Sequence, residues 1–174
     1  MPTILPPPLD VQSYHINALV FRTLEEFDPD RDTAGDFNVD FDVQRSAQDE
    51  QSFRIIMHIN VAEDGYAVDT NPSHSISLTI VGYFSFAPGT DEEQMQRMIR
   101  INGSSILYGI ARGLVGQATG ASKHGQFVLP TVNFVEIVKA KEAAEVESSG
   151  DQRQLTNGES AEQRDIATAE TEHA

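Results

Sequence analysis

Few residues in this 174-residue sequence have the types and spacing that chemistry requires. No two of the five histidines stand four residues apart, as the ligands of a helical metal site would. They are His15, His58, His74, His124 and His173. His15 and His58 would face each other only across neighbouring strands, and partly exposed sheet histidines are the simpler interpretation. Without any cysteine, disulfides and thiolate ligands are excluded. We predict no metal site and no resident cofactor.

Carboxylates and hydroxyls also lack a catalytic setting. Asp40 and Asp42 fall on one face of a predicted strand, about 7 Å apart at their backbones. That spacing suits a cation or acid–base pair, but no histidine or third ligand stands nearby in the sequence, so a solvated face is favoured. The Ser104–Ser105 pair and Ser122 have no G-x-S-x-G context. The sequence therefore predicts a protein that is not an enzyme.

Three glycines stand out in an apolar segment that has helical spacing. Gly109, Gly113 and Gly116 follow one another at i, i+4 and i+7, and each costs a helix about 0.8–1 kcal/mol relative to alanine. They do not follow a strand or belong to a P-loop, so phosphate binding is rejected. A ridge of small residues lets another helix approach closely. We favour a subunit interface here over the alternative, a kinked helix that is partly loop.

The elements that must position these residues follow from hydrophobic periodicity. Alternating apolar residues predict strands over residues 14–22, 37–44, 53–61 and 75–86. Gly82, within the apolar row of the last strand, suggests a bulge or a close approach. Runs of strands followed by runs of helices indicate an α+β fold with an antiparallel sheet.

Helix signals occupy the second half of the sequence. Thr90 and Glu93 have the spacing of a capping box, and Asn102–Gly103 is expected to end the short helix that follows. Helices are predicted over residues 94–101, 106–120 and 133–145. The expected architecture is a four-stranded antiparallel sheet with a short helix, a long glycine-containing helix and a C-terminal helix packed on one side.

Composition divides the chain into three parts. We expect a Pro-rich N-terminal arm over residues 1–10, a folded domain over 11–140, and an acidic disordered tail over 141–174. The formal net charge of −15 argues against nucleic acid and anionic membranes as partners. No signal peptide or membrane-spanning run is expected.

Three segments resemble those of the SecB export chaperones, in the same order along the chain. They are GYFSF over residues 82–86, ILYGIAR over 106–112 and LPTVNFVEIV over 129–138. The family has GIFSI-like, ILFPYAR-like and LAPVNF-like segments at these points. The resemblance covers about residues 11–139, and the last segment is the most specific.

The resemblance implies a cytoplasmic chaperone that holds unfolded preproteins in hydrophobic grooves without ATP or a metal. It implies a homotetramer built as a dimer of dimers, with the second helix between dimers, which agrees with the glycine ridge. By position, the client groove lies between the second strand and the last helix. Its lining residues would be Val39, Phe41, Val43, Phe134, Ile137 and Val138. Buried core packing is the alternative interpretation of these residues.

The resemblance also implies transfer of clients to the SecA motor, but this chain departs from that part of the pattern. The family presents acidic residues to SecA from its sheet and first strand. Ser75, Ser77 and Arg22 stand at or near the matching positions. We therefore expect client holding to transfer better than SecA coupling, and a chaperone dedicated to one client, such as an antitoxin, is the alternative. A small-ligand-binding domain is a weaker alternative, because no convergent polar set supports it.

Overall fold

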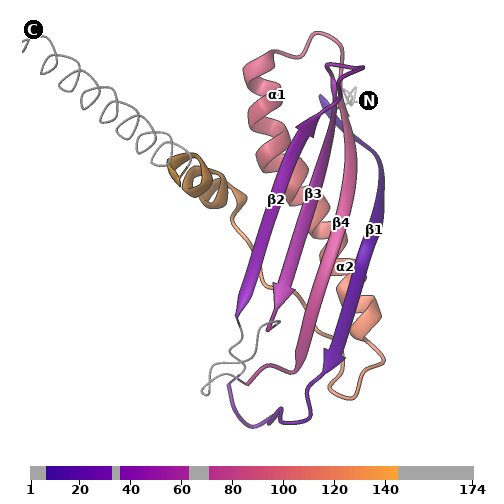
Figure 1. Ribbon diagram of the computed structural model, residues 1–174, viewed down its shortest axis with the longest axis vertical. Coiled ribbons are helices and arrows are strands. Elements are labelled where there is room, and N and C mark those ends of the chain that lie inside the picture. The colour runs from indigo at the N-terminus through magenta and orange to yellow at the C-terminus, as the bar shows by residue number, and fades with distance from the viewer. Residues whose placement is uncertain (1–6, 33–35, 63–70, 145–174) are drawn as a thin grey trace, which may run out of the picture. The chain divides into compact units, whose positions relative to one another are not determined.

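The computed structural model describes residues 7–32, 36–62 and 71–144. Contacts divide the chain into two compact units, one up to Phe134 and one from Val135 on. The first unit contains, in chain order, β1 (Leu9–Thr23), β2 (Phe37–Arg45), β3 (Ser52–Val61), β4 (His74–Phe86), α1 (Glu92–Met98), the π-helix η1 (Ile99–Gly103) and α2 (Ser104–Thr119) (Figure 1). A last helix runs over residues 134–144.

The four strands form one antiparallel sheet in the order β1-β4-β3-β2. The predicted α+β architecture with a four-stranded antiparallel sheet is confirmed. β1 begins at Leu9, inside the segment predicted as a Pro-rich arm. Residues 1–6 of that arm, and the predicted acidic tail from residue 145 on, lie outside the described residues. β1 and β2 are the two edges of the sheet, so each has one side that no described strand pairs with.

One face of the sheet is apolar and carries the helices. In β3 the odd-numbered residues from Phe53 to Val61 are at most 3% exposed, as the period-2 pattern predicts. α1 and α2 lie across this face, which we call the inner face (Figure 1). A Cβ at Gly82 would lie 2.9 Å from Leu107 Cδ1 of α2 and 2.8 Å from Phe84 Cε2. The expected close approach at Gly82 is therefore confirmed.

The predicted stop at Asn102–Gly103 is wrong. η1 continues from α1 directly into α2, and Gly103 has right-handed helical angles, φ −57° and ψ −48°. A Cβ on Gly103 would lie 2.9 Å from Ile55 Cδ1 of β3. The glycine therefore lets the continuous helix lie against the sheet, and its helix-ending role is not used. Ser104 is likewise helical and does not cap α2.

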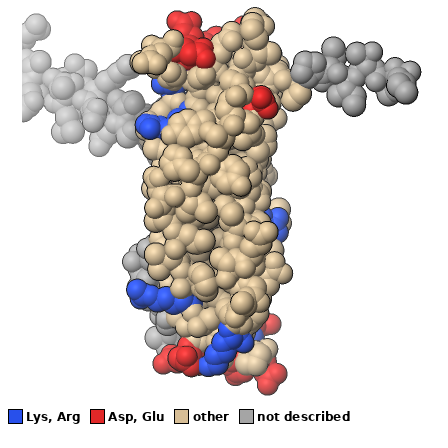
Figure 2. Space-filling model, turned by 90° about the vertical axis from the view of Figure 1, so that its right-hand side faces the viewer, with Lys and Arg blue, Asp and Glu red and all other residues tan. Residues whose placement is uncertain are grey.

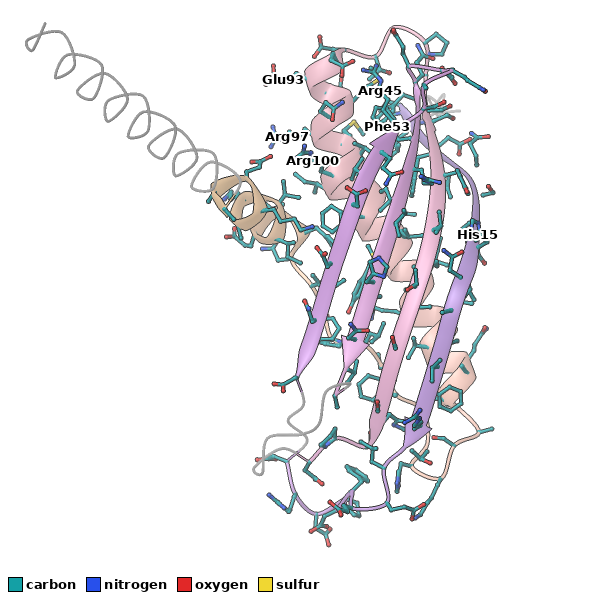
Figure 3. All side chains as sticks on the ribbon, in the orientation of Figure 1. His15, Arg45, Phe53, Glu93, Arg97 and Arg100 are labelled. Carbon is teal, nitrogen blue, oxygen red and sulfur yellow. The ribbon has the colours of Figure 1, made fainter. Side chains whose placement is uncertain are left out.

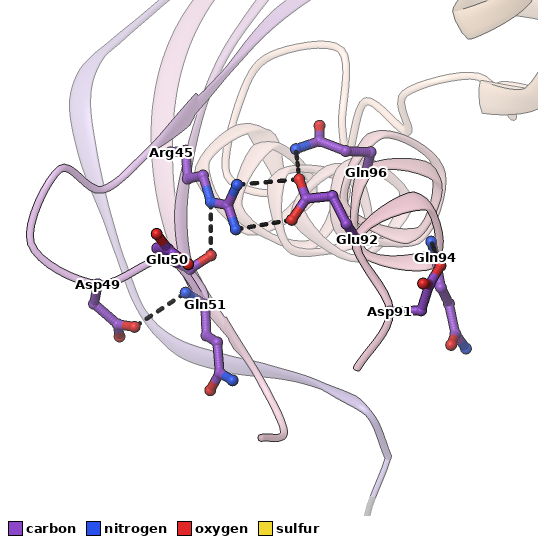
Figure 4. A network of polar contacts seen from close by, with 8 residues as sticks. All are labelled: Arg45, Asp49, Glu50, Gln51, Asp91, Glu92, Gln94 and Gln96. Carbon is purple, nitrogen blue, oxygen red and sulfur yellow. Dashed lines mark hydrogen bonds and ion pairs between the residues drawn. The ribbon is translucent and has the colours of Figure 1, made fainter. Parts of the chain in front are cut away.

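The start of α1 differs from the predicted capping box. Asp91 is the N-cap, and its carboxylate accepts a hydrogen bond from Gln94 N at 3.2 Å. The Thr90 hydroxyl donates to the Ala87 carbonyl instead, at 2.7 Å. The neighbouring Glu92 accepts hydrogen bonds from both terminal guanidinium nitrogens of Arg45, at 2.9 and 3.0 Å (Figure 4). We call this pair the Arg45–Glu92 clamp; it ties the end of β2 to α1.

The same end of the sheet contains a cation–π contact. The Arg45 guanidinium carbon lies 5.5 Å from the centre of the Phe53 ring, and Figure 3 places both residues beside the start of the helices. On α1 and η1, Arg97 and Arg100 point away from the sheet (Figure 3). The charged groups of the helices are thus kept outside the apolar layer, as burial of a charge requires.

Candidate functional site

The predicted client-groove residues on β2 share the inner face of the sheet. Val39, Phe41 and Val43 lie opposite Ile59, Met57 and Ile55 of β3, all three of which are buried. Phe41 is 6% exposed, whereas Val39 and Val43 are half-buried. The row therefore belongs to the core at its centre and becomes accessible toward its two ends.

Phe41 is brought into contact with Phe134 by the fold. Their ring centres lie 5.8 Å apart, and Phe134 is 4% exposed. Tyr108 of α2 packs edge-on against Phe134 at 5.6 Å and against Phe37 at 6.4 Å. We call Phe37, Phe41, Tyr108 and Phe134 the aromatic cluster. Sequence reasoning did not include Tyr108 or Phe37, although Phe37 shares the alternating row of β2.

Tyr108 also holds the segment that follows α2. Its hydroxyl donates a hydrogen bond to the Pro130 carbonyl at 2.6 Å, and burial raises the pKa of Tyr108 to about 12. Phe127 N donates to the Thr119 hydroxyl at 2.9 Å. These two bonds position the segment over residues 125–133, which leads directly to Phe134. The phenol thus stays a neutral hydrogen-bond donor throughout the physiological pH range.

Ile137 and Val138, the other two predicted groove residues, lie on the helix over residues 134–144. They stand three and four positions after Phe134, on the same side of that helix by periodicity. Both belong to the second compact unit. Their place in the groove stays a prediction.

The backbone N–H and C=O groups of β2 point alternately toward β3 and away from it. Ser46 N donates to the Ser52 carbonyl and Ala62 N to the Asp36 carbonyl, each at 2.9 Å. Because the N–H and C=O groups of alternate strand residues point to opposite sides, the even-numbered residues of β2 pair with β3. Val39 and Val43 therefore direct their backbone groups away from β3 while their side chains lie on the inner face.

The three glycines of the predicted interface have two different settings. Gly109 and Gly113 are exposed, and an added Cβ at either would have no neighbour within 4 Å. Gly116 is buried, and its Cβ would lie 2.7 Å from Gln126 Nε2. Ile106, which precedes Gly109 by less than one turn, is 40% exposed. The structure therefore leaves two of the three glycines on the outward surface of α2, and Gly116 packs within the protomer.

A second accessible apolar surface lies on β1. Tyr14, Ile16 and Phe21 pair with Gly82, Ile80 and Ile76, the buried row of β4. They therefore share the inner face, yet they are 47%, 40% and 39% exposed. Figure 2 views the molecule from the β1 side and shows a largely uncharged band between two charged ends. We call these three residues the β1 inner row.

The polar candidates do not converge on a reactive centre. β1 pairs with β4 rather than β3, so His15 and His58 are not cross-strand neighbours, contrary to the arrangement considered from sequence. His15 stacks on Tyr83 at 5.7 Å, and His58 Nδ1 lies 3.0 Å from the Thr79 hydroxyl. Asp42 accepts a hydrogen bond from Gln44. Within the described residues no three histidine or acidic side chains are grouped as a metal site would require.

None of the helices in the described part of the chain is long and apolar enough to span a membrane. With no reactive constellation there, the features left to explain are two apolar surfaces and an edge strand. Such features suit the binding of other polypeptides.

The sequence matches the family model described as "SecB: Preprotein translocase subunit SecB" over residues 6–145. No curated protein matches the sequence. A similar solved structure is the Mycobacterium tuberculosis Rv1957 SecB-like chaperone in complex with a ChAD peptide from the Rv1956 HigA1 antitoxin. It has a TM-score of 0.54 and 15% identity, and the match covers 72% of this chain and 91% of that one.

A weaker structural match is a Streptococcus agalactiae protein of unknown function. Its TM-score is 0.40 and its identity 13%, with 71% of this chain and 97% of that chain covered. The similarity to the mycobacterial protein agrees with the observed fold.

Proposed function

Because the chain belongs to the SecB family, we propose that it is an ATP-independent holdase that binds unfolded polypeptides and keeps them from aggregating. The observation that carries this proposal is the aromatic cluster beside the edge strand β2. Aromatic side chains next to an edge strand offer a client both apolar contacts and backbone partners. Since unfolding exposes apolar residues in any sequence, such contacts tolerate many clients.

The groove we propose is partly closed in the free protein. Phe41 and Phe134 are nearly buried against each other, so a client reaches these rings only if they part. Val39 and Val43 are half-buried and can be contacted first. Client binding would then select the conformation in which the two rings have separated. Ile137 and Val138 complete the proposed lining.

The test is aggregation of a denatured reporter protein followed by light scattering. Wild-type protein at near-stoichiometric amounts should slow the aggregation, and a V39S/V43S double variant should slow it less. Val20→Ser is a matched control, because Val20 is 51% exposed and pairs with Ser77 on the face of the sheet opposite the proposed lining. If wild-type protein leaves the aggregation rate unchanged, the holdase proposal is wrong.

We propose that the chain works as a homo-oligomer, a tetramer built as a dimer of dimers. Support comes from the outward Gly109 and Gly113 on α2, where an approaching helix meets no side chain, and from the accessible β1 inner row. Both surfaces would be covered by other copies. Light scattering of the purified protein measures the mass, and a single protomer at micromolar concentration would contradict the proposal.

The holdase could serve protein export in the cytoplasm by delivering preproteins to SecA. Against it stand Ser75 and Ser77, neutral residues on the outer face of β4, with the Ser77 hydroxyl bonded to Asn60 at 3.1 Å. Two neutral hydroxyls at these positions give a basic partner less electrostatic attraction than carboxylates would. We therefore expect weak binding in a direct SecA titration.

A chaperone dedicated to one client is the second candidate function. The neutral Ser75 and Ser77 favour it, because a protein that does not couple to SecA needs no acidic contacts at these positions. Affinity capture separates the two candidates: a general holdase should retain many unfolded chains and a dedicated one a single partner, such as an antitoxin.

A further inference from the structure

The loop over residues 120–125, which follows α2, is fastened to the sheet by histidines. His74, at the start of β4, is 1% exposed, and its Nε2 lies 2.8 Å from the Ser122 hydroxyl. His124 Nε2 lies 2.8 Å from the Leu24 carbonyl, just after β1, and its ring packs edge-on against Phe27 at 4.9 Å. The two histidines thus connect one loop to two separate strands.

The hydrogen bonds around His74 fix its neutral tautomer. The single proton of the Ser122 hydroxyl goes to the Gly125 carbonyl at 2.8 Å, so the oxygen of Ser122 must accept from His74 Nε2–H. His74 Nδ1 is then the acceptor for the Ser73 hydroxyl, 2.9 Å away. A carbonyl only accepts, so His124 Nε2 also carries a proton. Both rings are satisfied in their uncharged forms.

The surroundings of His74 disfavour a positive charge. The His124 ring lies 6.2 Å from it and Phe127 lies 5.7 Å from it. Burial first, and His124 second, lower the pKa of His74 below its ordinary value of 6.5. The charged or titratable side chains on the adjoining segments are Arg22, Glu25, Glu26, Asp28, Lys123 and His124. Of these, Glu25 is paired with Lys123 at 2.7 Å on the exposed rim.

The sign of the pH effect follows from the lowered pKa. Protons bind the opened loop more tightly than the closed one, so the closed state is fully favoured above pH 6.5 and loses stability as the pH falls toward the folded-state pKa.

The loop over residues 120–125 holds the first residue of the 125–133 segment, which leads to the aromatic cluster. Residues 125–133 run from Gly125, which accepts the Ser122 hydrogen bond, to Phe134 of the aromatic cluster. Along this segment Phe127 N is held by Thr119 and the Pro130 carbonyl by Tyr108. Opening of the loop removes the Ser122 hydrogen bond at Gly125, so the bonds from Thr119 and Tyr108 alone then hold the segment.

We propose that His74, Ser122 and His124 form a pH-sensitive latch that holds the 125–133 segment in place and opens under mildly acidic conditions. Resting on the proposed holdase function, the consequence is that acidification loosens one wall of the client groove and releases the client. Protonation puts a charge into a site whose partners are two hydroxyls and a second histidine, so the latch opens to give the ring water.

Hydrogen exchange on the wild-type protein and two variants tests the latch without any client. Amide hydrogen exchange of residues 120–127 should accelerate between pH 7.5 and 5.5 beyond the intrinsic pH dependence of exchange, while β3 amides keep their protection. The His74→Gln variant keeps an uncharged donor near Ser122 and should abolish the acceleration. The Ser122→Ala variant removes the bridge and should show fast exchange already at pH 7.5. Unchanged local exchange in wild-type protein would overturn the latch.

The affinity for a client then tests whether opening of the latch releases the client. A histidine-free unfolded reporter should bind wild-type protein at least about fivefold more weakly at pH 5.5 than at pH 7.5, a modest coupling. In His74→Gln the two affinities should agree. If no reporter binds at pH 7.5, the holdase proposal fails, while the exchange data still decide the latch. If binding is present but independent of pH, the regulatory role is wrong.

Discussion

The two edges of the inner sheet face carry similar apolar residues, which are buried at the β2 edge and exposed to solvent at the β1 edge. At the β2 edge Phe41 is 6% exposed, and at the β1 edge Phe21 is 39% and Tyr14 47% exposed. The β2 edge is closed by Phe134 and Tyr108 of the same chain. α2 reaches only part of the sheet, and no described helix or segment closes the β1 edge to the same degree. The difference indicates that one edge completes the protomer's own core and that the other stays accessible, as the proposed assembly of copies requires.

The largest expected effect is on stability and separates the two edges. Phe41→Ala removes a buried ring and should lower the free energy of unfolding by about 3–5 kcal/mol. Phe21→Ala, at the accessible edge, should cost the isolated protomer less than about 1 kcal/mol. Urea unfolding of both variants under dissociating conditions measures the contrast. Equal losses would show that both edges belong to the protomer core.

The next largest effect is expected on assembly, and it distinguishes the exposed Gly113 from the buried Gly116. Gly113→Leu points into open space in the protomer, so its fold should persist while the mass by light scattering falls toward the 19.1 kDa of one chain. A loss of about 100-fold in association corresponds to roughly 2.7 kcal/mol.

Gly116→Leu is the matched control for that change. Its side chain would meet Gln126 within the same protomer, so thermal stability should fall before the mass does. An unchanged mass for Gly113→Leu would remove α2 from the interface.

The architecture of the sheet was predictable because buried rows impose a period of two on the sequence. The rows of β2 and β3 appear where the alternation placed them, and the family resemblance included Phe41 and Phe134 in one set of six residues without pairing them. The position of β1 beside β4 was not predictable, since no local pattern records which distant strand is a neighbour. That is why the sequence left open whether His15 and His58 face each other across neighbouring strands.

The glycines within the helices were the least informative residues in the sequence, unlike Gly82 of β4. Gly103 has the same local signature as a helix stop, yet it serves contact with Ile55. Gly109 and Gly116 share a helical ridge, but one is exposed and the other packs on Gln126. Only the tertiary neighbours distinguish these roles, because a missing side chain leaves no pattern of its own. The hydrogen bond from Tyr108 to Pro130 could not be predicted either, because the acceptor is a backbone carbonyl 22 residues away and a carbonyl leaves no signal in the sequence.

A smaller effect probes how the closed edge is held. Tyr108→Phe keeps the aromatic contact with Phe134 but removes the hydrogen bond to the Pro130 carbonyl, which should cost about 1–1.5 kcal/mol. Thermal unfolding measures the loss, and hydrogen exchange should locate it in residues 125–133. Phe21→Tyr is the control: it adds a hydroxyl at the accessible edge, where water can solvate it, and should leave the unfolding temperature nearly unchanged. A global loss as large as that of Phe41→Ala would mean that the bond, and not ring packing, closes the edge.

The smallest effect is expected at the Arg45–Glu92 clamp, which belongs to the closed β2 edge but lies near its solvent-exposed end. The side chains are 33% and 55% exposed, so water and salt screen their attraction. Glu92→Gln should lower the unfolding midpoint only slightly, and 1 M salt should erase the difference from wild type. Hydrogen bonding from Gln96, with help from Arg45, lowers the pKa of Glu92, so whatever stability the clamp adds is present at neutral pH and fades as acid protonates the carboxylate. A midpoint shift that rivals Phe41→Ala would show that the β2 edge is held by charge, whereas a small one leaves the aromatic cluster as the cause of its closure.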